Sequence, residues 1–120
     1  MPKCILVVDD DSVNTLLAKR TLESKGYEVI TSQDGQAALD TLKTKIPDLI
    51  LLDVNMPKMD GYTFIMEKAK VPEFKSIPVI MLTAAKENAP LFKRHGVKAY
   101  LIKPLNAQEL LDKVQAVVPI

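Results

Sequence analysis

Four apolar segments of this 120-residue chain are each followed by polar side chains that could take part in chemistry. In chain order these side chains are Asp9 and Asp10, Asp53, Thr83 and Lys103. Three carboxylates that lie close together repel one another and resist ionisation in a partly desolvated site. A hard divalent cation relieves this repulsion because it prefers oxygen ligands, and Mg²⁺, or Mn²⁺ in its place, suits a site with few carboxylates. The residue types therefore predict a metal-assisted carboxylate site.

A carboxylate beside such a cation can act as a nucleophile. It can attack a phosphorus atom and form an aspartyl phosphate. Phosphoryl transfer needs positive charge around the phosphoryl oxygens, which the cation and Lys103 would supply. Thr83 offers a hydroxyl group that can donate a hydrogen bond to one of these oxygens. Phosphoryl transfer to a carboxylate is thus the chemistry that best fits this set of residues.

The segments that must position these residues are short and continuously apolar. They span residues 4–8, 49–52, 79–82 and 99–102, and a weaker fifth segment spans residues 28–32. Runs of this length without alternation are typical of strands covered on both faces, as in a parallel sheet. Helical patterns fall between them, at residues 13–26 with Gly26 as the closing glycine, 38–42, 64–66 after an Asp60–Gly61 turn, 89–95, and beyond the capping residue Asn106.

This alternation predicts one α/β domain over residues 1–120, with a doubly wound five-stranded parallel sheet and helices on both faces. Ligands of such folds bind beyond the carboxyl ends of the strands, where the strand order reverses. In the flavodoxin-like strand order 2-1-3-4-5, the first and third strands are neighbours. The acidic residues 9–11 and Asp53 would then share one crevice.

The composition narrows the setting in which the chain works. A net charge of +1 gives no overall attraction to nucleic acid or to a membrane surface, so neither is expected as a direct partner. The single cysteine, Cys4, excludes an internal disulfide and is expected to be buried. No apolar run approaches membrane-spanning length and no secretory signal is recognisable, so the expected location is the cytoplasm.

Four segments together carry a resemblance to a known family. They are residues 6–11, 52–61, 83–84 and 103–104. In their order and spacing the chain resembles, over essentially its whole length, the receiver domains of two-component response regulators, of the chemotaxis-regulator type. The resemblance implies that Asp53 accepts a phosphoryl group, that Asp10 binds the metal directly and that Asp9 helps directly or through water. It also implies that Asn55 lends its backbone carbonyl to the metal.

The same resemblance implies the remaining roles. Thr83 and Lys103 would bind the phosphoryl group. Thr83 and Tyr100 would form the switch, in which Tyr100 turns between outward and inward positions. The peptide bond between Lys103 and Pro104 would be cis. Phosphorylation would thereby change the surface formed by the expected helix 89–95, the strand 99–102 and the last helix.

The family also implies partners. Its phosphoryl donors are sensor histidine kinases or histidine phosphotransfer domains, and its output is altered binding, here to an unidentified protein at that surface. The expected function is therefore signal transduction in a phosphorelay. The domain would catalyse only its own phosphorylation and dephosphorylation, so it would not be an enzyme in the ordinary sense.

Other interpretations of the same residues remain. A phosphatase of the haloacid-dehalogenase type also uses an aspartate nucleophile, a threonine, a lysine and Mg²⁺, but it needs a second aspartate where this chain has Asn55. A flavin-binding module of the same topology would need a hydroxyl- or glycine-rich phosphate loop where residues 9–11 are acidic. A protein-interaction domain could keep the site and work without phosphorylation. Taken singly, acidic residues are ordinary helix caps, and Asp11 or Ser12 is the expected cap here.

Overall fold

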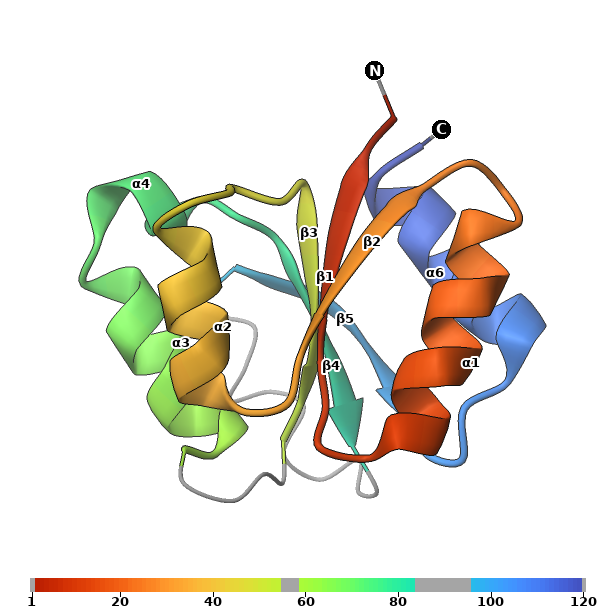
Figure 1. Cartoon of the computed structure of the whole chain (residues 1–120), viewed down its shortest axis with the longest axis horizontal. Coiled ribbons are helices and arrows are strands. Elements are labelled where there is room, and N and C mark those ends of the chain that lie inside the picture. The colour runs from red at the N-terminus through yellow and green to blue at the C-terminus, as the bar shows by residue number, and fades with distance from the viewer. Residues whose placement is uncertain (1, 55–58, 84–95, 120) are drawn as a thin grey trace.

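Five parallel strands form one sheet in the order β2-β1-β3-β4-β5, which confirms the predicted strand order (Figure 1). The computed structural model describes residues 2–54, 59–83 and 96–119. Its strands are β1 (Cys4–Val8), β2 (Glu28–Ser32), β3 (Leu49–Asp53), β4 (Val79–Thr83) and β5 (Val97–Ile102). Every residue of β1, β3 and β4 is buried. The apolar runs lack alternation because these strands are covered on both faces.

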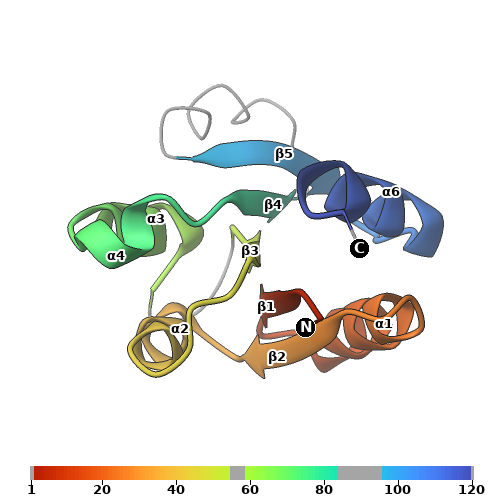
Figure 2. The ribbon, with the colours of Figure 1, turned by 90° about the horizontal axis from the view of Figure 1, so that it is seen from above.

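Helices cover both faces of the sheet (Figure 2). On one face lie α1 (Ser12–Glu23) and α6 (Ala107–Val117), and on the other lie α2 (Gly35–Leu42), α3 (Gly61–Ala69) and the short α4 (Pro72–Lys75). Successive strand residues point to opposite faces. Ile5 therefore packs in the core under α1 and α6, and its neighbour Leu6 packs in the core under α2 and α3. The doubly wound arrangement predicted from the sequence is confirmed.

Among the helices of the described residues, the four longer ones each begin after a short polar side chain. Each of these side chains accepts a hydrogen bond, 2.8–3.0 Å long, from a backbone amide in the first helical turn, which would otherwise lack a partner. The capping residues are Asp11, Asp34, Asp60 and Asn106. The predicted caps at Asp11 and Asn106 are confirmed. At Asp60 the sequence predicts only a turn, whereas its carboxylate also caps α3.

Two elements differ from the sequence-based expectations. Strand β5 begins at Val97, two residues before the predicted start at Ala99. Helix α4 is not predicted at all, because its four residues are too few to show a helical period. Pro72 at its first position is a sequence sign of this helix, whereas the burial of Phe74 is known from the structure alone.

Helix α1 buries fewer of its apolar side chains against the sheet than its sequence suggests. Val13 and Leu16, which help to mark the helix in the sequence, are exposed, and Ala18 and Leu22 make the buried contacts. The predicted helix 89–95 lies outside the described residues. Within the described part of the chain, no helix combines the length and the apolar character needed to cross a bilayer.

Candidate functional site

The pairing of the strands brings the predicted site residues to one edge of the sheet. In the parallel register of β1 and β3, Asp9 follows the last paired residue of β1 and lies beside Asp53 at the end of β3. Thr83 ends the next strand, β4, and its backbone carbonyl accepts a hydrogen bond from the backbone amide of Lys103 (2.9 Å). The carboxyl ends of β1, β3 and β4 and the residue after β5 therefore meet, as the topology predicts.

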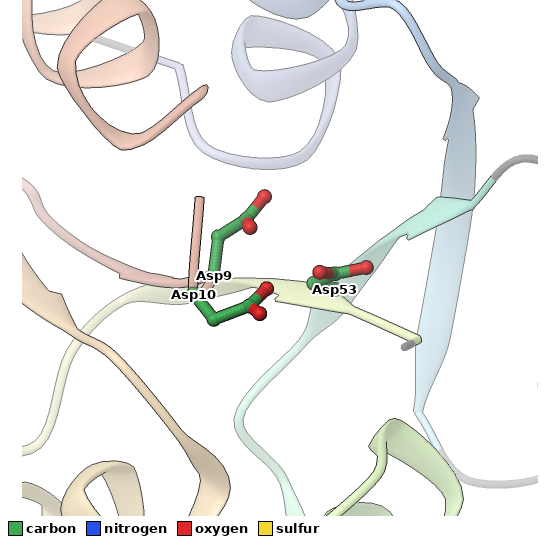
Figure 3. Close-up of side chains that lie close together, drawn as sticks. All are labelled: Asp9, Asp10 and Asp53. Carbon is green, nitrogen blue, oxygen red and sulfur yellow. The ribbon is translucent and has the colours of Figure 1, made fainter. Parts of the chain in front are cut away.

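Asp9, Asp10 and Asp53 form a group that we call the acidic cluster (Figure 3). One carboxylate oxygen from each residue lies within 4.8 Å of the other two. Asp9 and Asp53 are only 2% exposed, whereas Asp10 is exposed to solvent. Two hydrogen bonds hold Asp9, because its Oδ1 accepts from the backbone amide of Asp11 (2.9 Å) and its Oδ2 accepts from Asn14 Nδ2 (3.4 Å). These two hydrogen bonds fix the orientation of the Asp9 carboxylate beside the N-terminal end of α1.

Lys103 directs its ammonium group at the acidic cluster. Its Nζ lies 3.0 Å from Asp53 Oδ1 and 3.6 Å from Asp9 Oδ2. Burial by itself lowers the pKa of Lys103, but the hydrogen bond to Asp53 and the charges of Asp9 and Asp53 outweigh burial and raise the pKa above its ordinary value. Lys103 therefore carries its positive charge throughout the physiological pH range. The peptide bond between Lys103 and Pro104 is cis, which agrees with the expected geometry.

The other predicted residues lie at different distances from this centre. Thr83 is buried at the end of β4, the strand next to β3. Tyr100 lies on β5, where it pairs in register with Met81 of β4 and packs, partly buried, against the core under α2 and α3. Asn55 lies outside the described residues. Of the predicted site residues, the acidic cluster and Lys103 are therefore the ones for which the structure gives direct distances to one another.

The acidic cluster has the composition that suits a hard divalent cation. Among the described residues, Lys103 is the one cation that pairs with it, so three carboxylates face one ammonium group and a negative charge remains. All the potential ligand atoms are oxygens, which Mg²⁺ and similar ions prefer. Asp10 is exposed, so a bound ion could keep part of its water shell, as Mg²⁺ usually does. The residues present therefore fit such an ion.

A hollow beside the acidic cluster is not predicted from the sequence. It has a volume of about 220 Å³, lies between α1 and β2, and is lined by Thr15, Lys19 and Thr31 as well as by Asp9 and Asp10. The residue types on its walls are ordinary for exposed helix and strand surfaces, so no sequence pattern marks them. The hollow gives the two aspartates a second side that solvent or a partner could approach.

Gly61, the first residue of α3, lies against the backbone of Asp53 and Val54. A Cβ atom at this residue would lie 3.0 Å from Val54 Cα and 3.1 Å from the Asp53 carbonyl oxygen. Both neighbours are backbone atoms and cannot turn aside. We expect Gly61→Ala to lower the free energy of unfolding by roughly 1–3 kcal/mol, as overpacking typically does.

Urea unfolding monitored by circular dichroism would measure this loss. The matched control is Gly35→Ala, at the first position of α2, where the atoms nearest to the new Cβ belong to the flexible side chain of Met59. A smaller loss is expected there because methionine adapts its rotamer readily. If Gly61→Ala were as stable as the unchanged protein, the backbone of Asp53 and Val54 would not be packed tightly against Gly61.

Comparisons with known proteins agree with this geometry. The model of the response regulator receiver domain family matches residues 5–115. The chain is 31% identical over 118 residues to the polar-differentiation response regulator DivK of Brucella anthropi, with 97% of this chain and 96% of that protein covered. The structure of the chemotaxis protein CheY4 of Vibrio cholerae is similar with a TM-score of 0.92 and 34% identity, over 98% of this chain and 100% of that one.

A third similar protein is the receiver domain of a sensor histidine kinase from Pseudomonas aeruginosa PAO1. Its TM-score is 0.87 and its identity 30%, over 100% of both chains. That structure has a magnesium ion coordinated in its active-site cleft. The similarities in sequence and in fold extend over nearly the whole chain, and all of them are to response regulators or to receiver domains.

Proposed function

The chain belongs to the response regulator receiver domain family, and from this premise we propose that it accepts a phosphoryl group on Asp53 during two-component signalling. The observation that carries the proposal is the convergence of the acidic cluster with the Lys103 ammonium group, which lies 3.0 Å from Asp53 Oδ1. A buried carboxylate beside a fixed positive charge is suited to act as a nucleophile toward phosphorus. The chain is therefore proposed to act as a signalling module that modifies only itself.

The chemistry follows from the positions of the side chains. An oxygen atom of Asp53 attacks phosphorus, and the bond between phosphorus and the leaving group of the donor breaks as the new O–P bond forms. Lys103 is placed to donate hydrogen bonds to the phosphoryl oxygens, and the Thr83 hydroxyl to donate another. Asp9, Asp10 and Asp53, with the backbone carbonyl of Asn55, would hold Mg²⁺ or Mn²⁺, which supplies further positive charge at these oxygens. The magnesium ion in the similar Pseudomonas receiver domain supports this part of the proposal.

The proposed phosphoryl donor is a sensor histidine kinase or a histidine phosphotransfer domain. The similarity to the receiver domain of a histidine kinase supports this choice. The proposed output is altered binding of a protein at the surface of the expected helix 89–95, which lies outside the described residues, β5 and α6, with Thr83 and Tyr100 as the switch. New contacts of Thr83 with the phosphoryl oxygens would shift an existing equilibrium between two positions of Tyr100. The proposed location is the cytoplasm.

Intact-mass analysis tests the proposal. The protein is mixed with a small acyl-phosphate donor in the presence of Mg²⁺, and we expect the mass to increase by one phosphoryl group. The increase should be absent when a chelator removes the metal. A protein whose mass stays unchanged with donor and Mg²⁺, although it is folded and binds Mg²⁺, would show an interaction domain that works without phosphorylation.

The metal requirement leads to a separate prediction for Asp10. Because affinity for a hard cation follows the charge of its ligands, we expect Asp10→Asn to weaken Mg²⁺ binding about tenfold or more. Asp10 is exposed, so the fold should not change. Isothermal titration calorimetry with MgCl₂ measures the affinity.

Asp11→Asn is the matched control for this titration. Asp11 is the next residue in the chain, but its carboxylate caps α1 and is not part of the acidic cluster. Asparagine caps helices as well as aspartate does, so this variant should bind Mg²⁺ nearly as tightly as the unchanged protein. Equal affinities of the Asp10 and Asp11 variants would remove Asp10 from the metal site.

A further inference from the structure

Lys68 is a buried lysine beside apolar core residues. It lies on α3, one turn after Phe64, and is only 1% exposed, while Phe64 and Ile65 on the same side of the helix are also buried. Lysine is almost never fully buried unless it has a charged partner. The position is remote from the acidic cluster, at the opposite edge of the sheet where β4 and β5 begin. The proposed phosphorylation chemistry gives this residue no role.

Within residues 2–54, 59–83 and 96–119, the buried amine has one hydrogen-bond partner, which is uncharged. Lys68 Nζ donates a hydrogen bond to the backbone carbonyl of Lys75, the last residue of α4 (3.2 Å). The position that a Cβ atom of Gly96 would occupy lies 3.9 Å from Nζ, 3.8 Å from the Lys75 oxygen and 3.7 Å from the Ile77 oxygen. Gly96 in turn accepts a hydrogen bond from the backbone amide of Val79 (3.1 Å). The amine thus lies where four segments meet: α3, the end of α4, and the beginnings of β4 and β5.

No acidic side chain of the described residues pairs with Lys68. On its own helix, Glu67 pairs with Lys70. Both titratable side chains of α4, Glu73 and Lys75, are exposed, as is Lys98 of β5, and β4 contains no titratable group. The phenols Tyr62 of α3 and Tyr100 of β5 are partly buried against the same core. An ammonium group offers three donors, and the described residues give it one acceptor, the Lys75 carbonyl. The charged form is therefore poorly compensated in the closed core.

Burial without a counter-charge disfavours the charged form of an amine, and it lowers the pKa of Lys68 to about 8. When the surrounding corner opens and water reaches the amine, the pKa returns toward its ordinary value of about 10.4. The open state consequently binds more protons than the closed state between these two values. Closure is favoured progressively as the pH rises through this interval, and the charge penalty is present in full below it.

We propose that Lys68 is a proton-sensitive lock for the corner formed by α3, α4 and the beginnings of β4 and β5. The neutral amine keeps the corner closed, with Nζ donating to the Lys75 carbonyl. The ammonium form favours local opening, because only then can its remaining N–H groups bind water. The lock is independent of phosphorylation on Asp53, since it uses none of the residues of the acidic cluster.

Hydrogen exchange of the Val79 amide, which bonds to Gly96, tests the proposal. Protection factors, corrected for intrinsic exchange rates, are measured from about pH 7 to about pH 9.5. Above about pH 8 we expect protection in the unchanged protein to rise by up to about tenfold per pH unit. In Lys68→Met this rise should vanish, and protection at neutral pH should exceed that of the unchanged protein. Lys70→Met, a change of an exposed lysine on the same helix, should retain the rise.

Two results would overturn the proposal. One is protection of Val79 that does not depend on pH in the unchanged protein, and the other is the same dependence in Lys68→Met. An NMR titration of the Lys68 side-chain nitrogen in the unchanged protein provides a measurement that needs no variant. A pKa near 8 would support the lock, and an ordinary lysine pKa would show that the amine already reaches water and that no lock exists.

Discussion

Asp53→Asn is expected to abolish formation of the phosphorylated protein. The amide that replaces the carboxylate is not a nucleophile toward phosphorus. Asp53 is buried at the end of β3, so no other carboxylate can take over its position between Lys103 and the other acids. After treatment with an acyl-phosphate donor and Mg²⁺, intact-mass analysis should show the unchanged mass of the variant.

The control for this experiment is Asp40→Asn, which makes the same chemical change at an exposed residue of α2. This variant should gain one phosphoryl group as readily as the unchanged protein does. Circular dichroism must show that Asp53→Asn is folded, because the substitution also removes the closer of the two carboxylate partners of Lys103. If the folded Asp53 variant still gained a phosphoryl group, the acceptor would be another residue and the proposed function would need a different site.

Lys103→Met should produce two large effects in opposite directions. Removal of a preorganised positive group from the phosphoryl oxygens is expected to slow phosphorylation roughly 10²–10³-fold. Mg²⁺ should bind more tightly, because the ammonium group now lies 3.0 Å from Asp53 Oδ1 and 3.6 Å from Asp9 Oδ2 and repels a second cation at the same oxygens. Methionine keeps a long, unbranched side chain in the space of the lysine.

The two effects are measured separately, the first from the rate of mass increase with the acyl-phosphate donor and the second by calorimetric titration. Lys113→Met serves as the control, since Lys113 is an exposed lysine of α6 that makes no ion pair with the described residues. An unchanged rate of phosphorylation would exclude Lys103 from the chemistry. Weaker Mg²⁺ binding would show that the ammonium group organises the carboxylates instead of competing with the ion.

Much of the fold and of the candidate site could be predicted, because the deciding signals are local. Buried parallel strands leave short apolar runs in the sequence, and chemistry-bearing residues follow these runs at one edge of the sheet. For Asp9, Asp53 and Lys103 this placement alone predicts proximity, and the structure brings them within direct contact. The role of Tyr100 has no comparable local signal, since an aromatic residue on such a strand is also an ordinary packing residue.

Lys68 shows why other features could not be predicted. A lysine on a helix is normally exposed to solvent, so the residue type alone predicts an exposed side chain and not a buried one. One signal was present, because Lys68 follows Phe64 by four residues and Ile65 by three, and such spacings share one face of a helix. Its environment comes from α4 and Gly96, however, and these segments reach it only through tertiary packing. Helix α4 itself depends on the burial of Phe74, which no local pattern specifies.

The origin of the charged groups on separate strands has a consequence for folding. Asp9, Asp53 and Lys103 follow or end β1, β3 and β5, which are far apart in the chain, and β4 separates β5 from β3 in the sheet. Each parallel pairing in this sheet needs a long crossover connection. Closing long loops costs entropy before distant contacts can form, so we expect these groups to meet after the nearer helix and strand pairs have formed. A nascent or partly unfolded chain would therefore hold its aspartates without the opposing lysine. Only the fully folded protein could then accept a phosphoryl group, so incompletely folded molecules would not transmit a signal.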